Sequence, residues 1–155
     1  RQRQMCIRDR DRDCEIFTSD DDLYVWTAHE HQRENVSCVL VDEAQFLSPK
    51  QVLQLTLVVD KLKIPVLCYG LRSDFRGEPF PGSAYLLAWS DEMTEIKTIC
   101  KSGKKATMNA RLDESGNRVT EGDQISIGLN YEAQARDVFE LDKVSPIGYQ
   151  IPEAN

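Results

Sequence analysis

Two short apolar runs separated by a helix-like segment restrict the fold of this chain more than any other feature. Residues 36–42 are mostly apolar and end in Asp42, and residues 65–70 are mostly apolar and end in Gly70. Such runs are expected of strands in a parallel sheet that is covered on both faces. Between them, Ser48-Pro49 predicts a helix start, and apolar residues follow at helical spacing: Val52, Leu55, Val59 and Leu62. We therefore expect an α/β fold with a right-handed crossover.

The rest of the chain predicts further elements and four regions. Helical patterns cover residues 19–35, starting at Ser19, and residues 83–89 and 131–141, whereas residues 71–82 read as an ordered loop. Strand-like runs cover residues 94–100, 106–112 and 124–127. The expected regions are a disordered or artefactual lead-in (1–13), an incomplete α/β core (14–92), a small antiparallel β-ribbon subdomain (93–141) and a tail (142–155).

The charge and cysteine content excludes several classes of function. The 19 Lys and Arg residues against 26 Asp and Glu give a formal charge of −7, whereas a duplex-binding surface needs clustered positive charge. No apolar run approaches the roughly 18 residues of a membrane-spanning helix. Five cysteines without a CxxC pair fit a reducing compartment, and Cys38 and Cys68 are expected to be buried in the apolar runs. We expect a cytoplasmic protein that binds neither nucleic acid nor membrane.

The first apolar run ends in two acids, Asp42 and Glu43. Carboxylates at the carboxyl end of a buried strand can hold magnesium through water and accept a proton from an attacking hydroxyl. The competing interpretation is a strand end with two solvated acids.

Several ordered stretches of the chain resemble the type II thymidine kinase family in its bacterial form. The similarity runs from about Cys14 to at least Gly128, through four stretches: residues 39–46, 64–78, 82–91 and 97–106. It implies a P-loop-kinase-like parallel sheet, usually in a homotetramer. The implied reaction transfers the γ-phosphoryl group of ATP, with Mg²⁺, to the 5′-hydroxyl of thymidine.

The resemblance also assigns roles to single residues. Glu43 corresponds to the general base, and Asp42 to the magnesium-associated acid. Residues 71–80 correspond to a lasso-like loop that closes over the nucleoside, and residues 125–128 to a source of backbone contacts. The residues implied in substrate binding are Phe46, Leu71, Phe75, Asn109, Ser126, Gly128 and Tyr131.

The chain departs from the family pattern at two places. The phosphate-binding sequence GxxxxGK[ST] does not occur, and phosphoryl transfer depends on such positioning and charge stabilisation. We therefore expect an N-terminally truncated kinase that is inactive as it stands. The zinc ligands that the resemblance implies are also incomplete: Ser102 stands where the second ligand after Cys100 would be, and the later region offers Asp137 and Glu140. One thiolate cannot build a tetrahedral zinc site, so we expect no zinc.

Two other functions remain open. The chain could be a non-catalytic module that binds a nucleoside or mediates oligomerisation. Residues 42–45, Asp-Glu-Ala-Gln, also resemble the magnesium motif of helicase-like ATPases. Such motors need two large lobes and a basic channel, for which this acidic chain is too short.

Overall fold

The computed structural model describes residues 2–7, 10–124 and 130–148. They belong to a mixed α/β fold with two compact units. The first unit contains residues up to 41 together with 47–67, and the second contains residues 42–46 and those from 68 onward. None of the helices in these ranges is long and apolar enough to span a membrane.

The first unit begins with two antiparallel strands, β1 (Gln2–Ile7) and β2 (Arg10–Glu15). Gln2 lies opposite Glu15, and Ile7 lies opposite Arg10. The sequence predicted a frayed segment here because it has no apolar periodicity. Antiparallel pairing uses backbone groups, however, and does not require such a pattern.

Helix α1 (Leu23–Arg33) begins later than the expected Ser19. Its N-cap is Asp22, whose Oδ1 accepts the Val25 N–H at 3.0 Å. The preceding residues form a turn in which the Asp21 carboxylate accepts the Thr18 N–H at 2.5 Å. A cap must accept from the first free amide groups of the helix, and Asp22 is the residue in position to do so.

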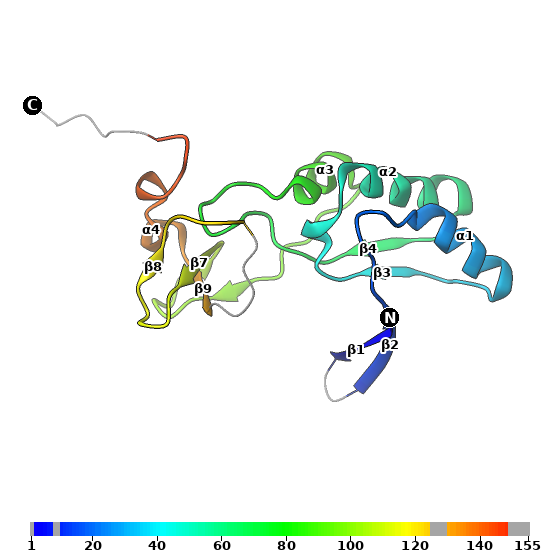
Figure 1. Ribbon diagram of the computed structural model, residues 1–155, viewed down its shortest axis with the longest axis horizontal. Coiled ribbons are helices and arrows are strands. Elements are labelled where there is room, and N and C mark those ends of the chain that lie inside the picture. Colours follow the sequence, from blue (N-terminus) through cyan, green and yellow to red (C-terminus); the bar gives the residue numbers. More distant parts are fainter. Residues whose placement is uncertain (1, 8–9, 125–129, 149–155) are drawn as a thin grey trace, which may run out of the picture. The chain divides into compact units, whose positions relative to one another are not determined.

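Helix α2 (Pro49–Leu57) starts where the sequence predicted. Ser48 and Gln51 form a reciprocal capping box, and Pro49 occupies the first helical position. The helix continues as a π-helical segment, Val58–Leu62, that ends at Lys63 in a left-handed conformation. Figure 1 shows α1 and α2 side by side, and the Gln54 side chain accepts the Leu23 N–H at 3.1 Å between them.

Strands β3 (Val39–Val41) and β4 (Val66–Cys68), which precede and follow α2 in the sequence, form the expected parallel pair (Figure 1). The Val39 N–H donates to the Pro65 carbonyl at 2.9 Å. Each strand has three residues, fewer than the apolar runs suggested, and the parallel sheet has only these two strands in the described ranges.

The expectation that both faces of these strands are buried is wrong. Val41 is buried, but Leu40 and Leu67 are 58% and 42% exposed, and Cys38 is also exposed. Side chains alternate between the two faces of a strand. The pair is therefore covered on the face of Val41, while the face of Leu40 and Leu67 stays open among the described residues.

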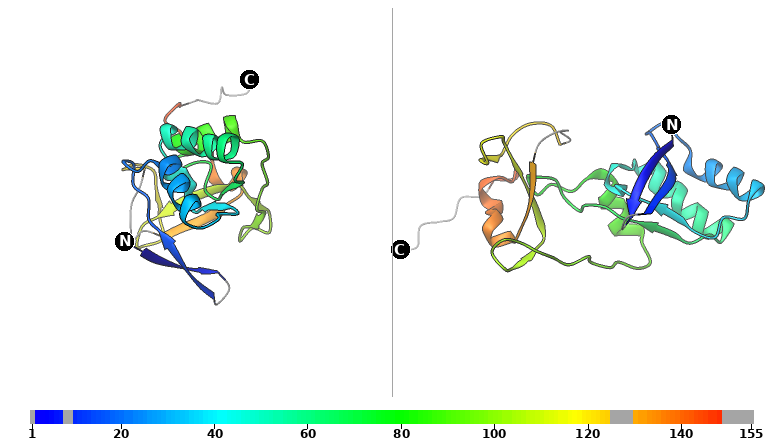
Figure 2. Two further views of the ribbon diagram at one scale, coloured as in Figure 1. Left: turned by 90° about the vertical axis from the view of Figure 1, so that its right-hand side faces the viewer. Right: turned by 90° about the horizontal axis from the view of Figure 1, so that it is seen from below.

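The second unit contains helix α3 (Pro81–Trp89) and several small sheets. Strands β5 (Thr98–Ile99) and β6 (Lys105–Ala106) form one antiparallel pair. A second, antiparallel sheet has β7 (Met108–Leu112) in the middle, with β8 (Arg118–Val119) on one side and β9 (Asn130–Gln134) on the other. Helix α4 (Arg136–Phe139) and the 3₁₀ turn Leu141–Lys143 follow, and α4 packs against β7 (Figure 2). The core beside this sheet contains Met108, Ala110, Phe139 and Val144.

The second unit corrects two sequence expectations. Residues 131–141 were expected to form one helix, but residues 130–134 form β9 and only residues 136–139 form α4. Pairing with β7 over five positions supplies backbone hydrogen bonds that outweigh the weak local preference for a helix. The run 94–100 is a strand only at Thr98–Ile99. Most of the run 124–127 lies outside the described residues.

Candidate active site

The two acids that follow β3 are exposed and occupy a sharp turn. Asp42 Oδ1 accepts the Glu43 N–H at 2.9 Å. Glu43 has φ = +52°, a left-handed conformation that non-glycine residues adopt rarely and at a cost. The residues that follow form a 3₁₀ turn, Ala44–Phe46. Both carboxylates thus lie directly after the strand, as the sequence predicted.

Gln45 connects Glu43 to the loop after β4. Gln45 is only 2% exposed, and its Nε2 donates to Glu43 Oε2 at 2.5 Å. Its Oε1 accepts the Leu71 N–H at 3.1 Å. The buried amide therefore holds the carboxylate of Glu43 beside the first residue of the predicted lasso loop. The role of Gln45 is not visible in the sequence, since it depends on a partner 26 residues away.

Gly70 lies against Gln45. A Cβ atom on Gly70 would be 2.5 Å from Gln45 Oε1, 3.0 Å from the Gln45 backbone nitrogen and 3.2 Å from that of Ala44. The Ala44 N–H also donates to the Tyr69 carbonyl at 2.8 Å. The chain segments after β3 and β4 are thus in close backbone contact, which only a residue without a side chain permits.

The loop of residues 71–80 is organised by a buried acid, Asp74. Asp74 is 3% exposed, and its Oδ1 accepts the backbone N–H groups of Arg76 and Glu78 at 2.8 and 2.9 Å. Its Oδ2 lies 3.3 Å from both Arg76 Nη2 and Gln124 Nε2. A carboxylate that accepts several hydrogen bonds is well satisfied inside the protein. These hydrogen bonds give the loop a defined shape.

The aromatic residues predicted to line the nucleoside site fall into two groups. Phe46 is 45% exposed and contacts Phe80 edge to face, with ring centroids 5.8 Å apart. Phe75 is 1% exposed and lies under the guanidinium of Arg111, which also binds the Tyr131 hydroxyl. Asn109 is half-buried in β7, opposite Ala133 of β9. Ser126 and Gly128 lie outside the described residues.

Cys100, Ser102, Asp137 and Glu140, which the sequence resemblance places at or near zinc-ligand positions, make other contacts. Cys100 Sγ lies 2.9 Å from Ser102 Oγ and 3.2 Å from the Lys104 carbonyl. The Ser102 hydroxyl lowers the pKa of the Cys100 thiol. Asp137 pairs with Lys104, and Glu140 pairs with Lys143. No group of three His, Cys, Asp or Glu residues suited to a metal occurs in the part of the chain that the structure describes.

The cysteine thiols should differ in reactivity. Burial raises the pKa of Cys68 from 9.0 to about 11, whereas Cys38 is exposed. Because only the thiolate is nucleophilic and Cys68 is partly buried, we expect iodoacetamide at pH 8 to modify the exposed Cys38 about tenfold or more faster than Cys68. Peptide mass spectrometry measures both rates. Equal rates in the folded protein would contradict this assignment.

The same shift affects stability at high pH. A thiol whose pKa is higher in the folded state favours folding below pH 9, and this contribution is lost as the pH rises from 9 towards 11. Urea unfolding of Cys68→Ser and the unchanged chain should therefore differ less at pH 11 than at pH 8.

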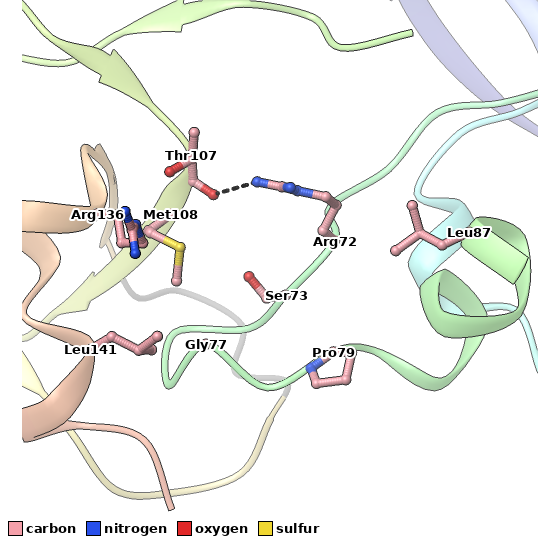
Figure 3. A pocket seen from close by; sticks show the side chains of 9 residues that line it. All are labelled: Arg72, Ser73, Gly77, Pro79, Leu87, Thr107, Met108, Arg136 and Leu141. Carbon is pink, nitrogen blue, oxygen red and sulfur yellow. Dashed lines mark hydrogen bonds between the residues drawn. The ribbon is translucent and has the colours of Figure 1, made fainter. Parts of the chain in front are cut away.

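A pocket of about 500 Å³ lies in the second unit (Figure 3). Arg72 crosses it to donate from Nη2 to the Thr107 carbonyl at 3.3 Å. Neither Asp42 nor Glu43 lines it. Its walls are formed by Arg72, Ser73, Gly77, Pro79, Leu87, Thr107, Met108, Arg136 and Leu141.

Comparison with known proteins identifies the family of this chain. A family model described as thymidine kinase matches residues 4–139. The thymidine kinase of Shewanella oneidensis is 55% identical over 129 residues, which cover 82% of this chain and 67% of that protein. The thymidine kinase of Photobacterium profundum is 55% identical over 120 residues, which cover 77% of this chain and 62% of that protein. The thymidine kinase of Legionella pneumophila strain Lens is 59% identical over 115 residues, which cover 74% of this chain and 55% of that protein. This chain thus spans little more than half to two thirds of these relatives' length, and it belongs to the thymidine kinase family.

Proposed function

We propose that these residues form part of an enzyme that transfers the γ-phosphoryl group of ATP to the 5′-hydroxyl of thymidine. The observation that carries the proposal is the hydrogen bond from Gln45 to Glu43. It holds an exposed carboxylate directly after a strand and next to Leu71, the first residue of a structured loop. Membership of the thymidine kinase family supports the choice of substrates.

Glu43 is the general base in this proposal. Its carboxylate accepts the proton of the 5′-hydroxyl while that oxygen bonds to the γ-phosphorus, and the bond to the bridging oxygen of ADP breaks. Asp42 is the magnesium ligand in this proposal. Its carboxylate is exposed, and only one of its oxygens accepts the Glu43 N–H, so the other is available to a hydrated Mg²⁺ ion. Magnesium would neutralise charge on the β- and γ-phosphates.

The nucleoside is proposed to lie under the loop of residues 71–80. Support comes from the buried Asp74, which gives this loop a fixed shape, and from Arg111, which contacts both Phe75 and Tyr131. The proposed substrate-binding residues are those implied by the family resemblance: Phe46, Leu71, Phe75, Asn109, Ser126, Gly128 and Tyr131.

The 155 residues are proposed to be inactive alone because they contain no GxxxxGK[ST] sequence for the phosphates of ATP. The complete enzyme is proposed to be a cytoplasmic homo-oligomer. We also propose that it lacks structural zinc, since Asp137 and Glu140 are paired with lysines.

The test compares two proteins. One is the 155-residue chain, and the other is the same chain extended to the full length of its relatives by its own reading frame. With labelled thymidine and Mg-ATP, the extended protein should form dTMP and the shorter chain should not. An extended protein that phosphorylates neither thymidine nor deoxyuridine would refute the proposal. Equilibrium dialysis of thymidine without ATP then shows whether the chain is a binding module instead.

A further inference from the structure

Arg111 of β7 is a buried cation whose surroundings differ from those of an ordinary ion pair. It is only 2% exposed. A guanidinium stays charged inside a protein, so its burial is costly unless its N–H groups are well used. In the described ranges, no carboxylate forms an ion pair with it. The partners of the Arg111 guanidinium are instead neutral groups: two aromatic side chains and two backbone carbonyls.

These contacts join three segments that are distant in sequence. The guanidinium carbon lies 3.8 Å from the centroid of the Phe75 ring. Nε donates to the Tyr131 hydroxyl at 3.0 Å. Nη1 and Nη2 donate to the carbonyls of Asp123 and Gln124, at 2.8 and 3.0 Å. One planar side chain thus sets the spacing between an aromatic ring, a phenol and a backbone turn.

The contacts extend to the centre of the 71–80 loop. Gln124, whose carbonyl binds Arg111, donates from its own side chain to Asp74 at 3.3 Å. Asp74 in turn holds the backbone of the loop. Arg111 therefore reaches this loop by two routes, through the ring of Phe75 and through Gln124.

We propose that Arg111 is a positioning residue for nucleoside binding. Its contacts fix the relative positions of Phe75, Tyr131 and the backbone of residues 123–124. This inference rests on the proposed function, because the importance of both aromatic residues for the nucleoside comes from it. The planar fork of arginine allows stacking and three directed hydrogen bonds at once, which the single ammonium of lysine cannot reproduce.

Arg118 provides a matched control. It is also an arginine of the same sheet, its guanidinium lies 4.0 Å above the ring of Phe139, and it donates to the Phe139 carbonyl. None of these partners belongs to the proposed nucleoside site. Arg118→Lys therefore loses a comparable ring contact and one guanidinium hydrogen bond, against three for Arg111, without touching Phe75, Tyr131 or residues 123–124.

The experiment measures thymidine retention by equilibrium dialysis for the 155-residue chain and its Arg111→Lys and Arg118→Lys variants. Displacement of binding groups by about 1 Å has large effects on recognition and rate, so Arg111→Lys should raise the Kd for thymidine about tenfold or more. Arg118→Lys should leave it unchanged. Thermal unfolding of both variants checks that they are folded at the temperature of the assay. Equal Kd values for Arg111→Lys and the unchanged chain would overturn the inference.

Two further measurements separate positioning from general stabilisation. Guanidinium ion at millimolar concentration, far below denaturing levels, should restore thymidine retention to Arg111→Ala. It should not alter the retention of Arg118→Ala, which is expected to bind thymidine like the unchanged chain. Failure of this rescue in a folded Arg111→Ala protein would count against positioning by the guanidinium.

Hydrogen exchange tests the inference without a ligand. Peptides of residues 71–80 and 130–134 should exchange faster in Arg111→Lys than in Arg118→Lys. Unchanged exchange in both peptides would overturn the positioning role. If the unchanged chain retains no thymidine, the proposed nucleoside site fails, and hydrogen exchange still decides whether Arg111 orders these segments.

Discussion

Glu43→Gln is expected to lower the turnover number of the complete enzyme about 10²- to 10⁴-fold, the usual contribution of a general base. Glutamine keeps the size of the side chain and can still contact Gln45, but it does not accept a proton. The Kd for thymidine should stay close to that of the unchanged enzyme. Steady-state kinetics with saturating Mg-ATP and thymidine, together with thymidine binding, measure both effects.

Glu140→Gln is the control for this substitution. Glu140 is also exposed, has a similar left-handed φ of +51° and has a hydrogen-bond partner in Lys143. The control variant should retain full turnover. If Glu43→Gln does the same, Glu43 is not the base, and the proposed chemistry of the strand end is wrong.

Gly70→Ala should both destabilise the protein and reduce its activity. The new Cβ would lie 2.5 Å from Gln45 Oε1 and 3.0 Å from the backbone nitrogen of Gln45. The amide has little freedom to move away, because its two ends are bonded to Leu71 and Glu43. Overpacking of this kind typically costs about 1–3 kcal/mol of unfolding free energy. Urea unfolding of the 155-residue chain measures this loss.

The loss of activity should exceed what destabilisation explains. Displacement of Gln45 releases the carboxylate of Glu43, so the turnover number should fall in enzyme that remains folded. Gly116→Ala is the comparison: its φ of +82° makes alanine strained, but a Cβ there has no heavy atom within 4 Å. This variant should lose stability and keep its turnover number. Similar turnover in the two variants would show that Gly70 does not act through Glu43.

The local elements were predictable because their causes lie within a few residues. Ser48, Pro49 and Gln51 determine the start of α2 through caps that span three positions. The apolar runs around them predicted the parallel pair β3–β4 and the position of Asp42 and Glu43 after the first strand. Helix α3 was also expected, although it begins two residues earlier, at Pro81.

Other features depend on which distant segments meet. Residues 130–134 resemble a helix locally and become a strand because β7 offers them hydrogen-bonding partners. Leu40 and Leu67 look like core residues in sequence, yet the face they occupy stays uncovered among the described residues. Helical or strand periodicity describes the faces of an element, but it does not say whether another element covers each face.

The candidate site illustrates the same division. The two acids at the end of an apolar run pointed to Glu43, whereas Phe75 and Tyr131 were implied by the resemblance to the thymidine kinase family. Neither the residue type nor the resemblance singled out Gln45 or Arg111. Leu71, the loop partner of Gln45, is 26 residues away, and the partners of Arg111 are 12 to 36 residues away. Capping and periodicity are short-range effects that residue order already contains. The burial of an amide against a loop, or of a guanidinium against a ring, arises only when folding brings those segments into contact.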